Sequence, residues 1–84
     1  MKFRKKPVVI EAKQYLAYIP NIKECLEFLE GNGGVNPISG EFYIRTLEGI
    51  MLCSRGDWIV KGSRGEFYPV KPEIFTQTYE PVEE

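Results

Sequence analysis

The sequence predicts a small α+β domain in which one helix packs on a mostly antiparallel, curved sheet or small open barrel of about five to six strands. The 84 residues are enough for one domain and too few for two, so residues 1–84 are expected to form a single domain. One segment has helical periodicity, and short strand-like segments separated by glycine turns fill the second half. Hydrophobic residues make up 43% and charged residues 27%, which is the balance of a globular chain rather than a disordered one.

Residues 8–15 predict the first strand, because apolar and polar side chains alternate with a period of two. Val8, Ile10 and Ala12 fall on one face, and more polar residues fall on the other. Residues 16–20 are expected to form the bend that follows.

Residues 21–30 predict the helix. Asn21 can cap the exposed amides of the first turn, and Glu24 stands where a capping-box partner should. Gly31 then supplies a left-handed stop. The apolar face of this helix consists of Ile22, Cys25, Leu26 and Leu29.

Residues 31–40 are rich in glycine and predict a flexible connection with a short edge strand around Val35. A meander of four strands is expected to follow, at residues 41–46, 50–54, 58–61 and 66–70. Residues 71–75 suit a single helical turn, because Pro72 is tolerated at a first helical position. Residues 76–82 are expected to close the sheet as a last strand, limited by Pro81.

The chain contains no histidine, which removes the usual general base at neutral pH and the Ser–His and Cys–His nucleophile pairs. It also removes the commonest zinc ligand, and two cysteines 28 positions apart cannot make a four-ligand structural site. Cys25 and Cys53 are too few for a disulfide scaffold and are expected to be reduced and buried. We therefore expect no metal and no cofactor.

Carboxylates leave acid–base chemistry open, and a deep cleft around Asp57 or Glu66 would favour an enzyme. Asp57 lies between Gly56 and Trp58 at a sharp turn, where a short carboxylate can accept backbone amide hydrogen bonds, so a structural role is favoured. The two glycine-rich segments, 31–34 and 62–65, are interpreted as turns. The first follows a helix and the second lacks the Lys-Ser/Thr ending of a phosphate loop.

Nothing at the start of the chain resembles a secretory signal, and no apolar run is long enough to cross a bilayer. The chain is therefore expected to be cytoplasmic and to have no membrane partner. A net charge of −1 gives no global field, but cations crowd the first residues and acidic groups crowd the last. One interpretation is that both ends are solvated. The other is that the start of the chain forms a basic arm that binds phosphate. The cations are Lys2, Arg4, Lys5 and Lys6; the acidic groups are Glu80, Glu83 and Glu84.

Aromatic and basic residues interleave in the second half, as single-strand nucleic-acid binding by stacking requires. The rings are Trp58, Phe67, Tyr68, Phe75 and Tyr79. The alternative is that most of these rings belong to the core, because half of the residues in a meander face inward. The candidate binding residues are Arg55, Trp58, Lys61, Arg64, Tyr68 and Lys71.

Several segments carry a family resemblance: residues 1–12, 56–62, 65–75 and 78–82. In these segments the chain resembles a family of small bacteriophage and prophage proteins without an assigned activity. The resemblance implies expression in a bacterial host from a phage or prophage locus, and it implies no cofactor or catalytic residue. Members of that family often have cysteine where this chain has Val70, so no thiol role carries over to that position.

The leading hypothesis is a non-enzymatic interaction module, a phage-derived accessory protein that binds a host or phage protein. The alternative is nucleic-acid binding through the basic arm and the aromatic–basic strands, with an affinity that falls steeply with salt. An enzyme that uses carboxylates or a small-molecule pocket is a third hypothesis. Homodimerisation is also predicted, because a thin core and an unprotected sheet edge favour pairing.

Overall fold

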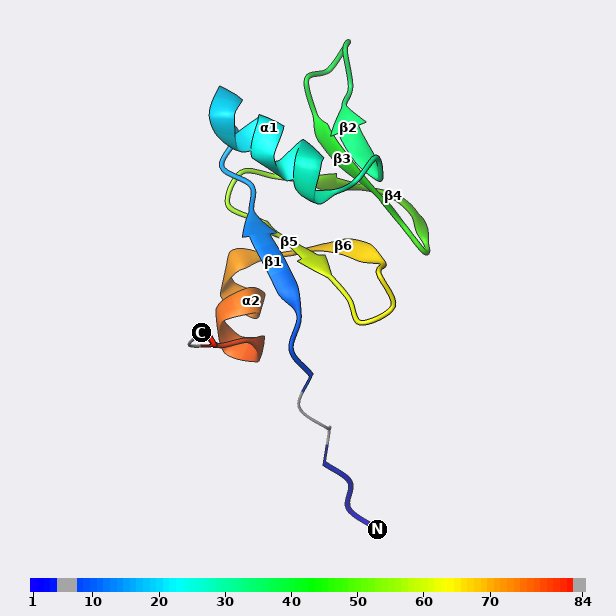
Figure 1. Ribbon diagram of the computed structural model, residues 1–84, viewed down its shortest axis with the longest axis vertical. Coiled ribbons are helices and arrows are strands. Elements are labelled where there is room, and N and C mark those ends of the chain that lie inside the picture. The colour runs from blue at the N-terminus through cyan, green and yellow to red at the C-terminus, as the bar shows by residue number, and fades with distance from the viewer. Residues whose placement is uncertain (5–7, 83–84) are drawn as a thin grey trace.

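The computed structural model describes residues 1–4 and 8–82 and has α+β architecture, as predicted (Figure 1). Its elements, in chain order, are β1 (Glu11–Gln14), α1 (Ile19–Phe28), β2 (Gly33–Val35), β3 (Phe42–Thr46), β4 (Gly49–Cys53), β5 (Trp58–Lys61), β6 (Phe67–Val70) and α2 (Pro72–Thr78). The strands form two antiparallel sheets of three, so the described residues contain two sheets rather than one curved sheet or barrel.

Sheet A has the order β1-β5-β6, with β5 in the centre. Two successive residues of β5, Ile59 and Val60, are fully buried although their side chains point to opposite faces of the sheet. One face of sheet A is directed at the main core, and α2 covers the other face (Figure 1). Both faces of this sheet are therefore covered.

Sheet B has the order β2-β3-β4, with a hairpin that joins β3 to β4. Phe42 and Ile44 of β3 are buried on its inner face. Tyr43 and Arg45 alternate with them and lie on the outer face, where Arg45 is exposed. Among the residues that the structure describes, this sheet is covered on one face only.

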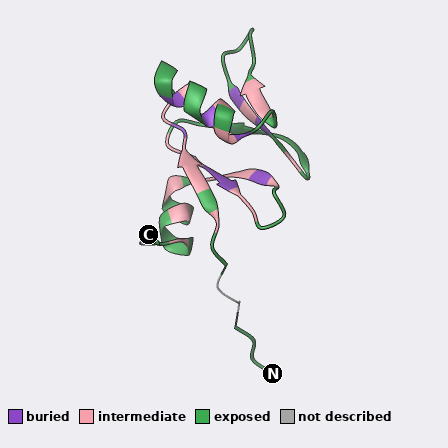
Figure 2. Ribbon diagram, viewed as in Figure 1, coloured by how far each residue is buried: buried purple, intermediate pink, exposed green. Residues whose placement is uncertain are grey.

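The main core lies between the two sheets and α1, as the buried segments in Figure 2 show. Tyr15 stacks on Phe42 with ring centroids 4.3 Å apart, which joins the end of β1 to sheet B. The buried residues of this core are Tyr15, Cys25, Leu29, Phe42, Ile44, Cys53, Ile59 and Phe67.

The predicted helix is confirmed, but its start, its end and its cap are wrong. It ends at Phe28 rather than at residue 30, and the left-handed backbone begins at Glu30, one residue before the predicted stop at Gly31. The helix begins at Ile19, and Tyr18 precedes it without a side-chain cap. Pro20 lies in the first turn, where its missing N–H costs no hydrogen bond. Asn21 is inside the helix and buried, so its side chain serves the bend before the helix instead of the helix amides.

Two other predicted elements differ from the structure at their ends. The first strand begins at Glu11 rather than Val8, because its partner β5 ends at Lys61, the residue opposite Glu11. The residues at 76–82 do not form a closing strand. Pro72 begins a helical turn as predicted, but the helix continues to Thr78 and packs on sheet A. The short strand around Val35 is confirmed as β2.

Candidate interaction surface

Trp58 and Tyr68, the two aromatic candidates for binding, face α2 rather than open solvent. Trp58 stacks on Phe75 with ring centroids 4.2 Å apart and an interplanar angle of 6°. Phe75 contacts Tyr79 at 5.1 Å, and the hydroxyl oxygens of Tyr79 and Tyr68 lie 3.3 Å apart. These four rings therefore form a second, smaller cluster in which they pack on one another.

This environment also alters the titration of Tyr68. Burial, followed by the hydrogen bond with Tyr79, raises the pKa of Tyr68 to about 12. The phenol is thus held in its neutral form, which suits a packed ring.

Lys61 and Lys71 each form an ion pair with an acidic side chain. Lys61 is three residues after Trp58 in the same strand, so its side chain lies on the opposite face. Its Nζ atom is 3.6 Å from Glu30 Oε2 and lies over the Phe67 ring. The Nζ atom of Lys71 is 3.1 Å from Asp57 Oδ2.

Arg55 and Arg64 lie in two different turns, one before β5 and one after it, and both side chains are exposed. The six candidate binding residues therefore do not form one aromatic–basic face. The structure brings Trp58 and Tyr68 into one ring cluster with Phe75 and Tyr79, and it pairs Lys61 with Glu30 and Lys71 with Asp57.

Asp57 has the structural role that the sequence predicts. It is 3% exposed, and its Oδ2 atom accepts a hydrogen bond of 2.8 Å from the Ser54 amide. Its ion pair with Lys71 ties the start of α2 to the turn before β5. Burial, and secondarily the negative charge of Asp57, raises the pKa of the adjacent Cys53 thiol to about 12.

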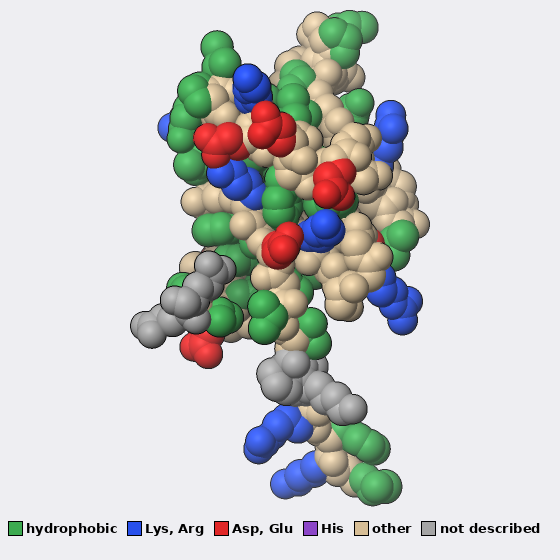
Figure 3. Space-filling model, in the orientation of Figure 1, with side chains coloured by type: hydrophobic (Ala, Val, Ile, Leu, Met, Phe, Trp, Pro, Cys, Tyr) green, Lys and Arg blue, Asp and Glu red, His purple; other side chains and the backbone are tan. Residues whose placement is uncertain are grey.

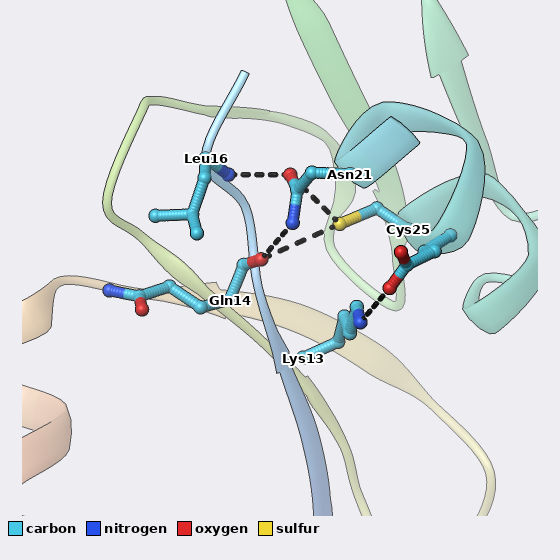
Figure 4. Close-up of polar contacts among 6 residues, drawn as sticks. Lys13, Gln14, Leu16, Asn21 and Cys25 are labelled. Carbon is cyan, nitrogen blue, oxygen red and sulfur yellow. Dashed lines mark hydrogen bonds and ion pairs between the residues drawn. The ribbon is translucent and has the colours of Figure 1, made fainter. Parts of the chain in front are cut away.

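A polar network around Asn21 fixes α1 against β1 (Figure 4). The Asn21 side chain accepts a hydrogen bond from the Leu16 amide at 2.6 Å and donates one to the Gln14 carbonyl at 2.9 Å. The Cys25 thiol lies 3.7 Å from the same Gln14 oxygen, and burial raises its pKa. Both cysteines are free and buried, as predicted, and both are held as thiols at neutral pH.

Lys13 and Glu24 form an ion pair beside this network (Figure 4), and the hydrogen bond to Glu24 raises the pKa of Lys13. Because both side chains are partly exposed, the pair adds little to stability. The hydrogen bonds of Asn21 therefore set the orientation of α1 relative to β1.

Two open grooves, of about 220 and 300 Å³, lie on the surface of the domain. The larger one is next to the end of β4, and its lining includes Tyr15, Glu41, Leu52 and Arg55. Neither Asp57 nor Glu66 lines either groove. Among residues 1–4 and 8–82, no three His, Cys, Asp or Glu side chains come close enough together to hold a metal ion.

The largest apolar feature on a strand is a surface that the sequence prediction missed. Ile50, Met51 and Leu52 are consecutive residues of β4 and are 67%, 42% and 55% exposed. Ile50 lies opposite Arg45 and Leu52 opposite Tyr43, so these side chains share the outer face of sheet B. Met51 lies opposite Ile44, on the inner side of the sheet, and is exposed because β4 is at the sheet edge. We call Tyr43, Arg45, Ile50 and Leu52, together with Met51 at the edge, the β4 surface. The available signal was the sequence of β4, which is apolar throughout and lacks the alternation of a half-buried strand.

The predicted basic arm is only partly within the described residues. Lys2 and Arg4 are exposed, and the segment 1–4 that contains them lies away from both sheets (Figure 1), while Lys5 and Lys6 lie outside the described residues. Figure 3 shows basic side chains on this segment, whereas acidic and basic side chains are interspersed on the viewed face of the domain. At the other end, Glu80 is exposed, and the predicted acidic residues Glu83 and Glu84 lie outside the described range.

No protein-family model matches the chain, and neither a curated protein nor a solved structure does. Within the described part of the chain, neither α1 nor α2 has the length and apolar character needed to cross a bilayer.

Proposed function

We propose that this protein is a non-enzymatic interaction module, a phage-derived accessory protein that binds a host or phage protein through the β4 surface. The observation that carries the proposal is the exposure of three consecutive apolar residues, Ile50 to Leu52, on the edge strand of sheet B. Edge strands of monomeric proteins usually carry charges, prolines or bulges that discourage pairing. An unprotected apolar edge is instead typical of a strand that another chain covers.

The composition of the outer face of sheet B supports a protein as the partner. Ile50 and Leu52 provide an aliphatic centre, and Tyr43 lies directly opposite Leu52. Arg45 is exposed beside them. Aromatic residues and arginine are enriched in protein interfaces, where an apolar centre is surrounded by polar groups.

The contacts of the second half argue against nucleic acid as the main partner. Binding of single strands by stacking needs free ring faces, but Trp58 already stacks on Phe75. Lys61 and Lys71 are engaged by acidic side chains. The resemblance to small phage proteins is consistent with a host or phage protein as the partner.

The test is an affinity capture from extracts of phage-infected bacteria, with and without nuclease. The wild-type chain is compared with the double variant Ile50→Lys/Leu52→Lys, which changes two exposed side chains and should preserve the fold. Ile38→Lys is the matched control, because Ile38 is 96% exposed and lies outside β4. Circular dichroism checks that all three proteins are folded.

The proposal expects a protein that the wild type and Ile38→Lys capture and the double variant loses, with or without nuclease. Equal capture by all three proteins would contradict a role for the β4 surface. Capture that disappears with nuclease and weakens steeply with salt would instead favour the nucleic-acid hypothesis.

A further inference from the structure

We infer that the free edge of β4 pairs antiparallel with β4 of a second copy, which joins two copies of sheet B into one six-stranded sheet. This inference deepens the proposed function, because it names a second copy as the occupant of the edge. The outer face of sheet B, doubled across the two copies, then stays open for the host or phage protein.

The edge itself is available for pairing. Among the described residues β4 is hydrogen-bonded to β3 alone, at the margin of sheet B. In an antiparallel sheet every second residue of such a strand turns its N–H and C=O groups outward. The five residues of β4 include no charged side chain and no proline, so nothing in the strand opposes pairing with an identical strand.

The sequence of β4 fixes the register of this pairing. A single antiparallel register overlaps all five residues of both strands, and it places Met51 opposite Met51 of the second copy. Ile50 then lies opposite Leu52 in both halves of the interface, as twofold symmetry requires. Because Ile50 and Leu52 share the outer face, the two apolar faces become continuous across the axis.

The charges at the two ends of β4 select the antiparallel direction. Glu48 immediately precedes the strand, and Arg55 follows it by two residues. Antiparallel pairing brings Glu48 of one copy to the end where Arg55 of the other lies, so opposite charges meet at both margins. Parallel pairing would place Glu48 beside Glu48 and Arg55 beside Arg55, which is unfavourable.

The test substitutes Met51, which lies on the twofold axis of the proposed pairing. Light scattering of the wild type should give twice the 9.7 kDa mass of the chain. Met51→Lys and Met51→Glu should each give a monomer, because like charges then lie directly opposite each other. An equimolar mixture of the two variants should regain the doubled mass, since the lysine introduced in one copy would lie opposite the glutamate introduced in the other. Monomeric wild type at all concentrations, or a dimer of Met51→Lys alone, would overturn the inference.

Disulfide trapping tests the register separately. Opposite residues of antiparallel strands have Cα atoms about 4.5–5.5 Å apart, which suits a disulfide. Met51→Cys should therefore form a cross-linked dimer on mild oxidation, while the buried native thiols do not compete. Ile38→Cys, at an exposed position outside β4, should stay monomeric. A doubled mass without a Met51→Cys cross-link would place the interface elsewhere and overturn the inference.

The two proposals can fail independently. A monomeric wild type whose captured partner is lost in Ile50→Lys/Leu52→Lys overturns pairing of copies and supports the proposed function. A Met51-centred dimer that captures no further protein supports the pairing and contradicts the proposed function.

Discussion

The two sheets of this domain have the same number of strands but opposite degrees of cover. In sheet A, the successive residues Ile59 and Val60 are both fully buried, because the main core and α2 lie on opposite faces. In sheet B, the successive residues Ile50, Met51 and Leu52 are all exposed. Both runs of residues are apolar, yet the run in β5 is buried by other parts of the chain and the run in β4 is exposed.

This difference separates apolar residues that pack in the interior from apolar residues that stay on the surface. Exposed single apolar residues are common on protein surfaces and need no explanation. A run of three on a free sheet edge is different, because the backbone groups of an edge are also available for pairing. Equivalent substitutions in the two sheets should therefore change the free energy of unfolding by different amounts.

The largest expected difference is between matched truncations in the two sheets. Ile59→Ala should lower the free energy of unfolding by about 2–5 kcal/mol, because it leaves a cavity in a fully buried site. Leu52→Ala should change it by about 0.5 kcal/mol or less in the monomer, because Leu52 is exposed. Urea denaturation at low protein concentration measures both. Similar losses of unfolding free energy in the two variants would show that Leu52 is buried to the same degree as Ile59.

The next largest effect concerns the ion pair that holds α2 on sheet A. Asp57→Ala should lower the free energy of unfolding by about 1–3 kcal/mol, because the Ser54 amide loses its acceptor in a buried turn. Lys71→Met should cost about 1 kcal/mol or less, since the Lys71 side chain is more than half exposed. Thermal and urea unfolding of both variants measures the difference. An equal effect of the two would mean that the ion pair, rather than the amide bond, carries the contribution of Asp57.

A smaller effect is expected from the ring stack under α2. Phe75→Leu should lower the free energy of unfolding in two ways. The smaller side chain buries less apolar area, and the loss of the ring stacked on Trp58 costs about a further 0.5–1.5 kcal/mol. Trp58 is the single tryptophan, so its fluorescence reports the change directly. Ile74→Ala, at the exposed neighbouring position of α2, is the control and should leave the emission spectrum unchanged. Unchanged emission in Phe75→Leu would mean that α2 does not cover Trp58 in solution.

The smallest expected effect is a loss of stability at alkaline pH. The pKa of Tyr68 rises from 10.0 to about 12 on folding, so the folded protein holds a proton that the unfolded chain releases. The stabilisation is complete below pH 10 and is lost as the pH rises through about 12. Tyr68→Phe should therefore show a shallower decline of the unfolding free energy across this window, with the part due to Cys53 remaining. An unaltered slope would show that Tyr68 is not buried against α2.

Local patterns predicted most of this fold because they depend on neighbouring residues. The alternation and turn glycines located β3, β4, β5 and β6, and the turn residue Asp57 was assigned its role from its two neighbours. Asn21 was misassigned because its hydrogen-bond partners lie in β1 and the following bend, outside the helix it was expected to cap.

The cover of each sheet could not be predicted in this way, because it depends on contacts between distant segments. Thr76 and Thr78 favour strands by intrinsic propensity, but the segment is helical. Phe75 of α2 and Tyr79, the residue that follows the helix, pack on each other and against Trp58 and Tyr68. In that packing Trp58 and Tyr68 are half-buried, whereas Ile50 and Leu52 of the β4 surface are exposed.

The most direct measurement is site-specific photo-crosslinking in infected bacteria, with a photoreactive amino acid placed at single positions. Position 52 lies on the β4 surface, whereas positions 9 and 38 are exposed apolar sites outside it. The account predicts a defined cross-linked protein from position 52 and none from positions 9 and 38. Cross-links to a defined protein from position 9 or 38, with none from position 52, would contradict it.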